Sequence, residues 1–401
     1  MNIKSLLLGS AAALVAVSGV QAADAVVVAE PEPAEYVRIC DVYGAGYFYI
    51  PGTETCLRIG GYVRMDISGG DANIRGWAGV DANDARNGKL QGTYGINTRF
   101  ALQTYTGQET ELGTLKTFTE TRFDWTNAWH SNRIGIDDGD YLGTYGGGPG
   151  TSVTAKFAWI QLGGLRLGKD ESAYDTFNGY AGAVINDTLV PYGDFDTNLI
   201  SYTFDAGNGF SAIVSLEQGS GNQSAADLDG DGIFSDKVPN YIGAIDSYMP
   251  HVVAGVKYTQ GWGGVSLVGA YDSNYGTWAG KARLDVNATE QLSLWIMGGY
   301  GEEDFNPTNP GGQSFYKPWT GNWAVWGGGT YKVNEKTSLN AQLSYDEGKT
   351  FGLAANVSYD IVPGFNVTAE VDYFNSSRNL DIDRFNKVDG IGGIVRFQRS
   401  F

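Results

Sequence analysis

Residues 350–374 read "TFGLAANVSYDIVPGFNVTAEVDYF". On both sides of the short stretch "VPGF", apolar and polar residues alternate with a period of two. Leu353, Val357 and Tyr359 alternate with Asn356 and Ser358, for example. This period places apolar side chains on one face of a β-strand and polar side chains on the other. The stretch therefore predicts an antiparallel hairpin with one apolar face and one polar face.

The same alternation runs through most of the chain from Leu57 onward. It predicts sixteen strands, at residues 57–68, 90–106, 111–126, 152–163, 164–169, 197–206, 209–218, 251–260, 263–272, 277–288, 290–300, 322–333, 336–346, 350–361, 364–375 and 387–401. The connections between these strands alternate in length. One set is short, such as "GQET", "AGNG" and "VNEK". The other is mostly long, at 69–89, 127–151, 170–196, 219–250, 301–321 and 376–386, with brief members at 273–276 and 347–349.

The alternation in loop length decides the fold class. A soluble β-sandwich has no reason to gather its tight turns at one end and most of its long loops at the other. Outer-membrane barrels do this, with short periplasmic turns, long extracellular loops, an apolar outer band and a polar interior. We therefore expect an all-β chain in which residues 57–401 form a sixteen-stranded antiparallel transmembrane β-barrel. A barrel of this size encloses water and has no packed core.

The first residues, "MNIKSLLLGSAAALVAVSGVQA", predict a secretory signal peptide at 1–22. Lys4 supplies the positive charge, an apolar run follows, and a small-residue cleavage site ends at Ala22. The alternative is a membrane anchor, but the apolar run is short and no stop-transfer pattern follows it. Residues 23–56 are then expected to form a periplasmic N-terminal segment that begins rich in proline and glutamate.

Two cysteines, Cys40 and Cys56, stand in a chain that we expect to be exported. An even number of cysteines in an oxidising compartment favours a disulfide. The bridge would close the aromatic loop "DVYGAGYFYIPGTET" directly before the first strand. The alternative is two unpaired thiols.

The composition also limits the class of function. The chain carries a formal net charge of −18, which argues against a nucleic-acid partner because such partners require basic surfaces. Only two histidines occur, His130 and His251, and no nucleophile signature accompanies either. "GKT" at 348–350 lacks the first glycine of a P-loop. We expect no enzymatic activity.

The third long loop, at about 170–196, is unlike a turn or a solvated linker. It has six acidic residues and no lysine or arginine, and its middle reads "YAGAVI". The acids cannot pack into an apolar core, and the apolar middle should not stand bare in water. Both demands are met if the loop folds into the lumen against the barrel wall. We expect it to narrow the pore at mid-height.

Four stretches of the chain resemble the alphaproteobacterial general porins. The similarity rests on "VRICDVYGAGYFYIPGTETCLRIGGYVR", "GLRLGKDESAYDTF", "VPYGDFDTNLISY" and the terminal "VRFQRSF". It covers essentially all residues after the signal peptide. The resemblance implies a sixteen-stranded barrel, a homotrimer, and a third loop that acts as a constriction. Arg399 departs from the apolar alternation of the C-terminal strand, whereas Phe397 and Phe401 keep it.

The charges predict an electric field across the narrowest point. The loop supplies the acidic side, with Asp170, Glu171, Asp175, Asp187, Asp194 and Asp196, and the first three strands supply the basic side, with Arg58, Arg64, Arg99, Lys116 and Arg122. Such a field would orient polar solutes and reject apolar ones. The alternative is that these charges are spread along the channel without a common role.

The fourth long loop contains "DLDGDGIFSDK", which resembles a calcium loop. Asp227, Asp229 and Asp231 stand at positions 1, 3 and 5, and Ser235 stands at position 9. Val238 occupies position 12, where a bidentate glutamate is normally found. The alternative is an acidic turn. No cofactor is expected to be required, and Ca²⁺ in this extracellular loop is the one candidate.

Together these features predict an outer-membrane porin, a water-filled channel for passive diffusion of small hydrophilic solutes and ions. The expected partners are two further copies of the chain, outer-membrane lipid and lipopolysaccharide. One alternative is a substrate-selective channel, which would show an aromatic track or a basic cluster without acids opposite it. Another is a surface adhesin or barrel hydrolase with a closed lumen.

Overall fold

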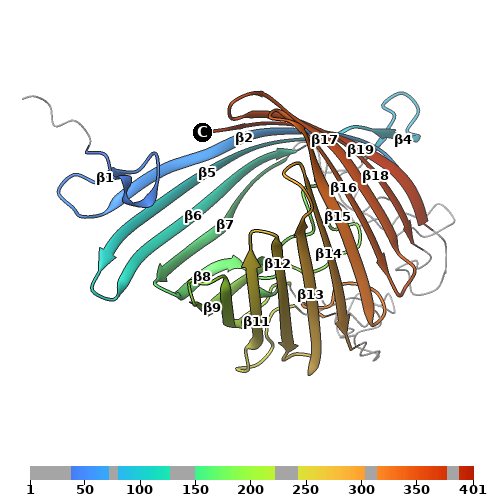
Figure 1. The fold of residues 1–401 in the computed structure, drawn as a ribbon. Coiled ribbons are helices and arrows are strands. Elements are labelled where there is room, and N and C mark those ends of the chain that lie inside the picture. Colours follow the sequence, from blue (N-terminus) through green and yellow to red (C-terminus); the bar gives the residue numbers. More distant parts are fainter. Residues whose placement is uncertain (1–37, 72–79, 127–149, 222–242, 303–313, 377–387) are drawn as a thin grey trace, which may run out of the picture. The chain divides into compact units, whose positions relative to one another are not determined.

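A computed structural model describes residues 38–71, 80–126, 150–221, 243–302, 314–376 and 388–401. The chain divides into Met1–Arg38 and Ile39–Phe401, and the second unit contains the barrel (Figure 1). The predicted signal peptide lies outside the described residues. Among the residues described, no helix is both long enough and apolar enough to cross a membrane.

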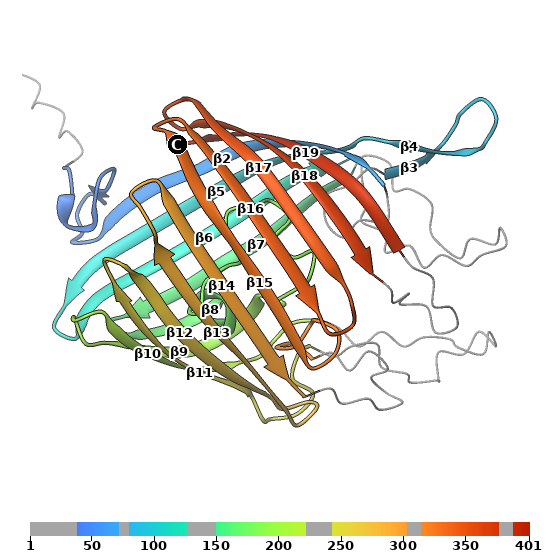
Figure 2. The same cartoon turned by 45° about the vertical axis from the view of Figure 1, so that its right-hand side comes forward.

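Sixteen strands close into one antiparallel barrel (Figures 1 and 2). They are β2 (Cys56–Gly70), β5 (Gly95–Thr110), β6 (Gly113–Thr126), β7 (Gly150–Leu162), β8 (Leu165–Glu171), β9 (Asp196–Asp205), β10 (Phe210–Glu217), β11 (His251–Gln260), β12 (Gly263–Asp272), β13 (Thr277–Asn287), β14 (Leu292–Gly301), β15 (Trp323–Asn334), β16 (Thr337–Asp346), β17 (Phe351–Val362), β18 (Phe365–Ser376) and β19 (Val388–Ser400). Each pairs with the next in chain order. The barrel closes where β19 returns to β2, with Val395 opposite Ile67. The predicted strand number and direction are confirmed.

The described residues include five smaller elements. A single turn of 3-10 helix, η2 (Asp41–Tyr43), precedes the two-residue strand β1 (Phe48–Tyr49), which pairs with the start of β2. The strands β3 (Val80–Asn83) and β4 (Leu90–Thr93) form a separate two-stranded sheet beyond the ends of β2 and β5 (Figure 2). The fifth is the short helix α1 (Ala173–Thr176). The strand predicted at 90–106 is therefore wrong at its start, because residues 90–93 pair with β3 and the barrel strand begins at Gly95.

The alternation places an apolar face outward. Val63, Phe100 and Phe123 stand opposite one another on β2, β5 and β6 and are 48%, 38% and 42% exposed. The neighbouring arginines, Arg64 and Arg99, point to the other face and form ion pairs there. We call this polar face the inner wall. An apolar outside and a polar inside suit a strand whose one face meets lipid and whose other face meets water.

Candidate functional site

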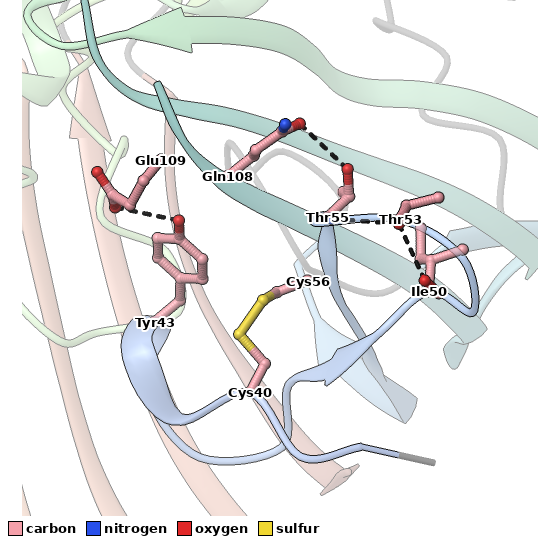
Figure 3. Close-up of a disulfide and its surroundings, with 8 residues drawn as sticks. All are labelled: Cys40, Tyr43, Ile50, Thr53, Thr55, Cys56, Gln108 and Glu109. Carbon is pink, nitrogen blue, oxygen red and sulfur yellow. Dashed lines mark hydrogen bonds between the residues drawn. A yellow bond between two sulfur atoms is a disulfide. The ribbon is translucent and has the colours of Figure 1, made fainter. Parts of the chain in front are cut away.

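The disulfide predicted between Cys40 and Cys56 is present (Figure 3). Both cysteines are buried, and their Cα atoms are 6.0 Å apart. The bridge ties residues 40–55, which we call the N-terminal lobe, to the start of β2. The hydroxyl of Tyr43 donates to a carboxylate oxygen of Glu109 at 3.0 Å, and that of Thr55 donates to Gln108 at 3.2 Å. The lobe is thereby held beside the end of β5.

The third loop, residues 172–195, connects β8 to β9. Its first residues, 172–176, which we call the root, are held by several hydrogen bonds. The hydroxyl of Ser172 accepts a hydrogen bond from the backbone N–H of Tyr174 and so caps α1. Glu217 at the end of β10 accepts from the hydroxyl of Ser172 at 2.6 Å and from the N–H of Ala173 at 2.9 Å. It also accepts from the hydroxyl of Tyr316 at 3.0 Å. One buried carboxylate therefore fixes the first residues of the loop to the wall.

A buried ion pair completes the root. The Nζ of Lys281 on β13 lies 2.6 Å from the Asp175 carboxylate, and the two side chains are 0% and 1% exposed. The same Nζ donates to the carbonyl of Tyr192 at 2.8 Å and lies 4.0 Å from the centroid of the Tyr174 ring. Burial raises the pKa of Asp175, and the charge of Lys281 opposes that shift. The lysine thus joins the two ends of the loop.

The middle of the third loop, residues 183–190, forms hydrogen bonds with the inner wall of β15 to β18. We call this segment the tip. A carboxylate of β18, Glu370, accepts from the N–H groups of Ile185 and Asn186 at 2.6 and 2.7 Å. The side chain of Asn186 donates to Asp372 at 2.6 Å. Three more side chains donate hydrogen bonds to backbone carbonyls of the tip. Gln342 donates to Asp187, Trp326 to Val190 and Asn356 to Ala183. The loop therefore follows the polar face across several strands.

The packing of the tip also changes the ionisation of Asp187. Burial raises its pKa to about 7, and the negative charge of Glu370 raises it further, while a hydrogen bond from the hydroxyl of Tyr192 works in the opposite direction. An exposed aspartate would be fully ionised at neutral pH. Asp187 is instead about half protonated near pH 7.

The other predicted acids are mostly paired with bases. Asp170 and Glu171 belong to β8, where Asp170 bonds to Arg166 at 2.8 Å and Glu171 lies 2.6 Å from the Nζ of Lys156. Asp196, the first residue of β9, lies 2.5 Å from Lys156 and 2.9 Å from Lys169. Asp194 is partly exposed. The six acids therefore do not form one continuous negative surface.

Three of the five predicted bases are brought together on the inner wall. Arg64 and Arg99 stand opposite each other on β2 and β5, and Arg122 follows on β6. Their charges are partly balanced by acids on the same wall. The Nε atoms lie 3.2 Å from Asp66 for Arg64, 2.8 Å from Asp124 for Arg99 and 2.6 Å from Glu120 for Arg122. We call Arg64, Arg99 and Arg122, together with Arg396 of β19, the arginine wall.

Arg396 on β19 belongs to the arginine wall and was not predicted. Its Nε lies 2.7 Å from Asp66, which also pairs with Arg64. The signal was present in the sequence, since Arg396 alternates with Val395 and Phe397, but the pairing of the last strand with the first was needed to use it. The two remaining predicted bases lie apart: Arg58 covers the ring of Tyr105, and Lys116 is exposed on β6.

Sequence reasoning also missed the partners that hold the loop. Lys281, Glu370 and Glu217 lie on strands far from the loop in sequence, and no local pattern assigns them to it. The candidate calcium ligands Asp227, Asp229, Asp231 and Ser235 lie outside the described residues. Within the described ranges, no group of three or more His, Cys, Asp or Glu side chains could hold a metal ion.

Comparison with known proteins agrees with this architecture. A family model described as "Porin subfamily" matches residues 24–390. The Porin Omp2b proteins of Brucella suis biovar 1 and Brucella melitensis biotype 1 are each 50% identical over 403 residues, with both chains fully covered. The structure of Pseudomonas putida OprB at high pH aligns with a TM-score of 0.52 at 11% identity, over 86% of this chain and 94% of that one, which supports the fold. The chain belongs to the porin family and is a bacterial outer-membrane β-barrel channel.

Proposed function

We propose that the chain forms a trimeric general-diffusion pore in which the third loop lies inside the lumen and narrows it. The observation that carries the proposal is the set of bonds from the loop to the inner wall, from Asp175–Lys281 at the root to Ile185 and Asn186 on Glu370 at the tip. Bonds to polar residues of several strands fit a segment that crosses the lumen side of the barrel. Solutes would pass between this loop and the wall that it leaves uncovered.

The uncovered wall is the arginine wall on β19, β2, β5 and β6. The bonds of the third loop described above go instead to β10, β13, β15, β16, β17 and β18. The constriction would therefore have arginines on one side and the loop on the other. A polar solute in transit would align its dipole with this field. An apolar solute would displace water that the field orients and would make no electrostatic contact in return.

The charge balance supports a weak preference for cations. Asp170, Glu171 and Asp196 are paired with bases, and Asp187 is partly protonated near neutral pH. The arginines are in turn paired with Asp66, Asp124 and Glu120. The net charge of the chain is strongly negative, but charges on outer loops are screened beyond about 10 Å at 0.1 M salt. The preference should therefore fade as salt rises.

Planar-bilayer recording of the purified native oligomer tests the pore. Three equal conductance steps are expected, with a reversal potential slightly on the cation-selective side. Replacing both Arg99→Gln and Arg396→Gln should shift the reversal potential further toward cations. Arg399→Gln is the matched control, because among the described residues Arg399 donates to the backbone carbonyls of Pro363 and Ser400 and lies outside the arginine wall. A silent oligomer would support a closed barrel. An unchanged potential would place the current path elsewhere.

The outer face of β5 and β6 supports the trimer. Thr104 and Thr119 point outward, opposite Ile59 and Ala158, and their hydroxyls are 2.5 Å apart. The hydroxyls of Thr106 and Thr117 form a second pair at 2.6 Å. Small hydroxyl side chains favour close contact between membrane-embedded surfaces. Elsewhere the outer face carries larger apolar residues, such as Ile200, Leu267, Leu294 and Ile296.

The oligomer can be tested separately from conduction. Thr104→Arg introduces a charge where a neighbouring copy would pack and should convert the unheated trimer to monomer on a native gel. Ile296→Arg, on the outer face of β14, is the matched control and should leave the oligomer intact. Dissociation by both variants to the same extent would mean that the effect comes from lipid contact.

Two further proposals concern the ends of the chain and its loops. Residues 1–22 are removed on export. N-terminal sequencing of the outer-membrane form tests this, and the sequence should begin at Ala23.

The loop with Asp227, Asp229 and Asp231 binds Ca²⁺ weakly. Chelation should then raise its protease sensitivity, and equal digestion with and without calcium would leave only an acidic turn.

A further inference from the structure

The inner wall of β5, β6 and β7 carries aromatic rings in continuous contact. The ring centroids of Tyr105 and Phe118 are 4.6 Å apart, and Phe118 lies 5.5 Å from Phe157 and 5.6 Å from Trp159. All four rings are partly exposed. They share the face of Glu120 and Arg122, so they line the same side of the strands as the arginine wall. The barrel therefore presents a band of ring surface to its interior.

Basic side chains lie along this band. The guanidinium of Arg58 on β2 lies 3.9 Å from the centroid of Tyr105, and that of Arg166 on β8 lies 4.1 Å from Trp159. Lys116 lies two residues before Phe118 on the same face of β6 and is exposed. Cation–π attraction holds each guanidinium over its ring. Arg166 also donates hydrogen bonds to Gln161 and Asp170. The rings of β5, β6 and β7 are thus flanked by guanidinium groups from β2 and β8.

The band continues into the N-terminal lobe. Gly107 on β5 has no side chain, and a Cβ built there would lie 2.7 Å from the Tyr43 ring. Tyr43 therefore packs on the wall at this glycine, 5.8 Å from the ring of Tyr47. Arg58 lies 5.4 Å from Tyr47 as well as over Tyr105, and so links the lobe to the barrel. The short turn between β5 and β6 follows, which marks the periplasmic end.

The acids beside the band already have partners: Glu109 accepts from the hydroxyl of Tyr43, and Glu120 pairs with Arg122. Arg166 shares its charge with Asp170, whereas Arg58 and Lys116 form no ion pair with any residue that the structure describes. A ring-bearing solute would gain by stacking on the aromatic side chains. A negatively charged group on that solute would be attracted to Arg58 and Lys116. Neutral sugars would use the rings but not the charges.

We propose that this band, formed by Tyr47, Arg58, Tyr105, Lys116, Phe118 and Trp159, is a binding track for small ring-bearing anions, with aromatic carboxylates as the fitting class. The track rests on the proposed pore, since solutes reach it through the lumen. It lies at the periplasmic end, away from the third loop tip. It would slow and concentrate such anions in a channel that otherwise prefers cations weakly.

Ion-current analysis with benzoate tests the track. Benzoate added on the periplasmic side should reduce the open-channel current of the wild-type protein in a saturable manner, and acetate at the same concentration should not. Phe118→Leu keeps an apolar side chain but removes the ring, and should weaken the apparent benzoate affinity by about two- to tenfold. Phe123→Leu is the matched control, because Phe123 lies on the same strand and faces outward against Phe100.

The charge is tested by Arg58→Gln, which should weaken benzoate block and leave block by neutral benzyl alcohol unchanged. Equal effects of Phe118→Leu and Phe123→Leu, or no block by benzoate in a conducting channel, would overturn the track. Saturable block by glucose that depends on Phe118 and not on Arg58 would overturn the assignment to anions. Failure of the proposed pore would appear differently, as the absence of any conductance before solute is added.

Discussion

The root and the tip of the third loop are held to the same barrel wall by opposite electrostatic arrangements. At the root, Asp175 meets the opposite charge of Lys281 at 2.6 Å in a fully buried pair. At the tip, backbone N–H groups meet Glu370, and two further acids, Asp187 and Asp372, lie close by. The root compensates its charge internally. At the tip, several carboxylates lie close together. Their mutual repulsion is lowered by hydrogen bonds and by protonation.

This contrast indicates how a loop can be fixed and still adjustable. A buried ion pair is costly to break, because removing one partner leaves an isolated charge in a low dielectric. A carboxylate that accepts backbone hydrogen bonds is stabilised less and responds to nearby protonation. The root should therefore behave as a permanent anchor, and the tip should set the width of the passage.

The largest effect is expected from breaking the root. Lys281→Met leaves Asp175 buried without its partner, which should destabilise the docked loop by roughly 3–5 kcal/mol. Hydrogen exchange of the peptide covering residues 173–182 should become much faster, and the single-channel current should become noisy. The barrel should remain folded, because its strand ladder does not depend on this pair.

The matched variants for the root are a double change and a surface change. Asp175→Asn combined with Lys281→Met removes both charges and should recover much of the loss. Lys332→Met, at an exposed lysine of β15, should have no effect. If the double variant is no better than Lys281→Met alone, the lysine acts mainly through the carbonyl of Tyr192 and not through Asp175.

A smaller effect is expected from breaking the tip. Glu370→Gln removes a charged acceptor of the N–H groups of Ile185 and Asn186, which should cost about 1–3 kcal/mol of local stability. Exchange should accelerate at residues 183–188 and remain unchanged at the root, and the conductance should rise. Glu290→Gln, at an exposed turn, is the control for the loss of charge. Equal acceleration at both ends would mean that the loop docks as a single unit.

The sequence predicted the barrel well because each strand carries its own signal. Alternation within twelve residues is enough to assign faces, as Val63 and Arg64 illustrate. The same reasoning extended strand 90–106 too far at its start, because residues 90–93 alternate like a barrel strand but pair with β3. Alternation determines which residues can form a strand and not which strand will be the partner.

The candidate site was predicted only in part for the same reason. The acids of the third loop and Arg64, Arg99 and Arg122 were identified from their own segments. Their partners were not, because Lys281, Glu370 and Arg396 belong to strands that approach the site only after the barrel closes. The ring band was also missed, since Tyr105, Phe118 and Trp159 come from three strands and meet only through their register.

The smallest effect is expected from pH, and it separates the tip from the root. The pKa of Asp187 is raised to about 7 by burial and by Glu370, against about 3.9 for a free aspartate. The docked loop therefore binds a proton more tightly than the released loop. Docking is favoured at low pH, weakens as pH rises toward 7, and levels off above it. Between about pH 6 and pH 8, the change should be about 1 kcal/mol.

Hydrogen exchange at residues 183–188 should thus be slower at the lower pH, after correction for the intrinsic rate. Asp187→Asn should reduce this dependence, and any part that remains would come from Glu370 and Asp372, which accept hydrogen bonds from Ile185, Asn186 and Asn356. The root peptide should change less, since Lys281 compensates Asp175 whenever that carboxyl is ionised. If the pH dependence persists undiminished in Asp187→Asn, the responding group is the Glu370–Asp372 pair, and the tip is adjusted by the wall and not by the loop.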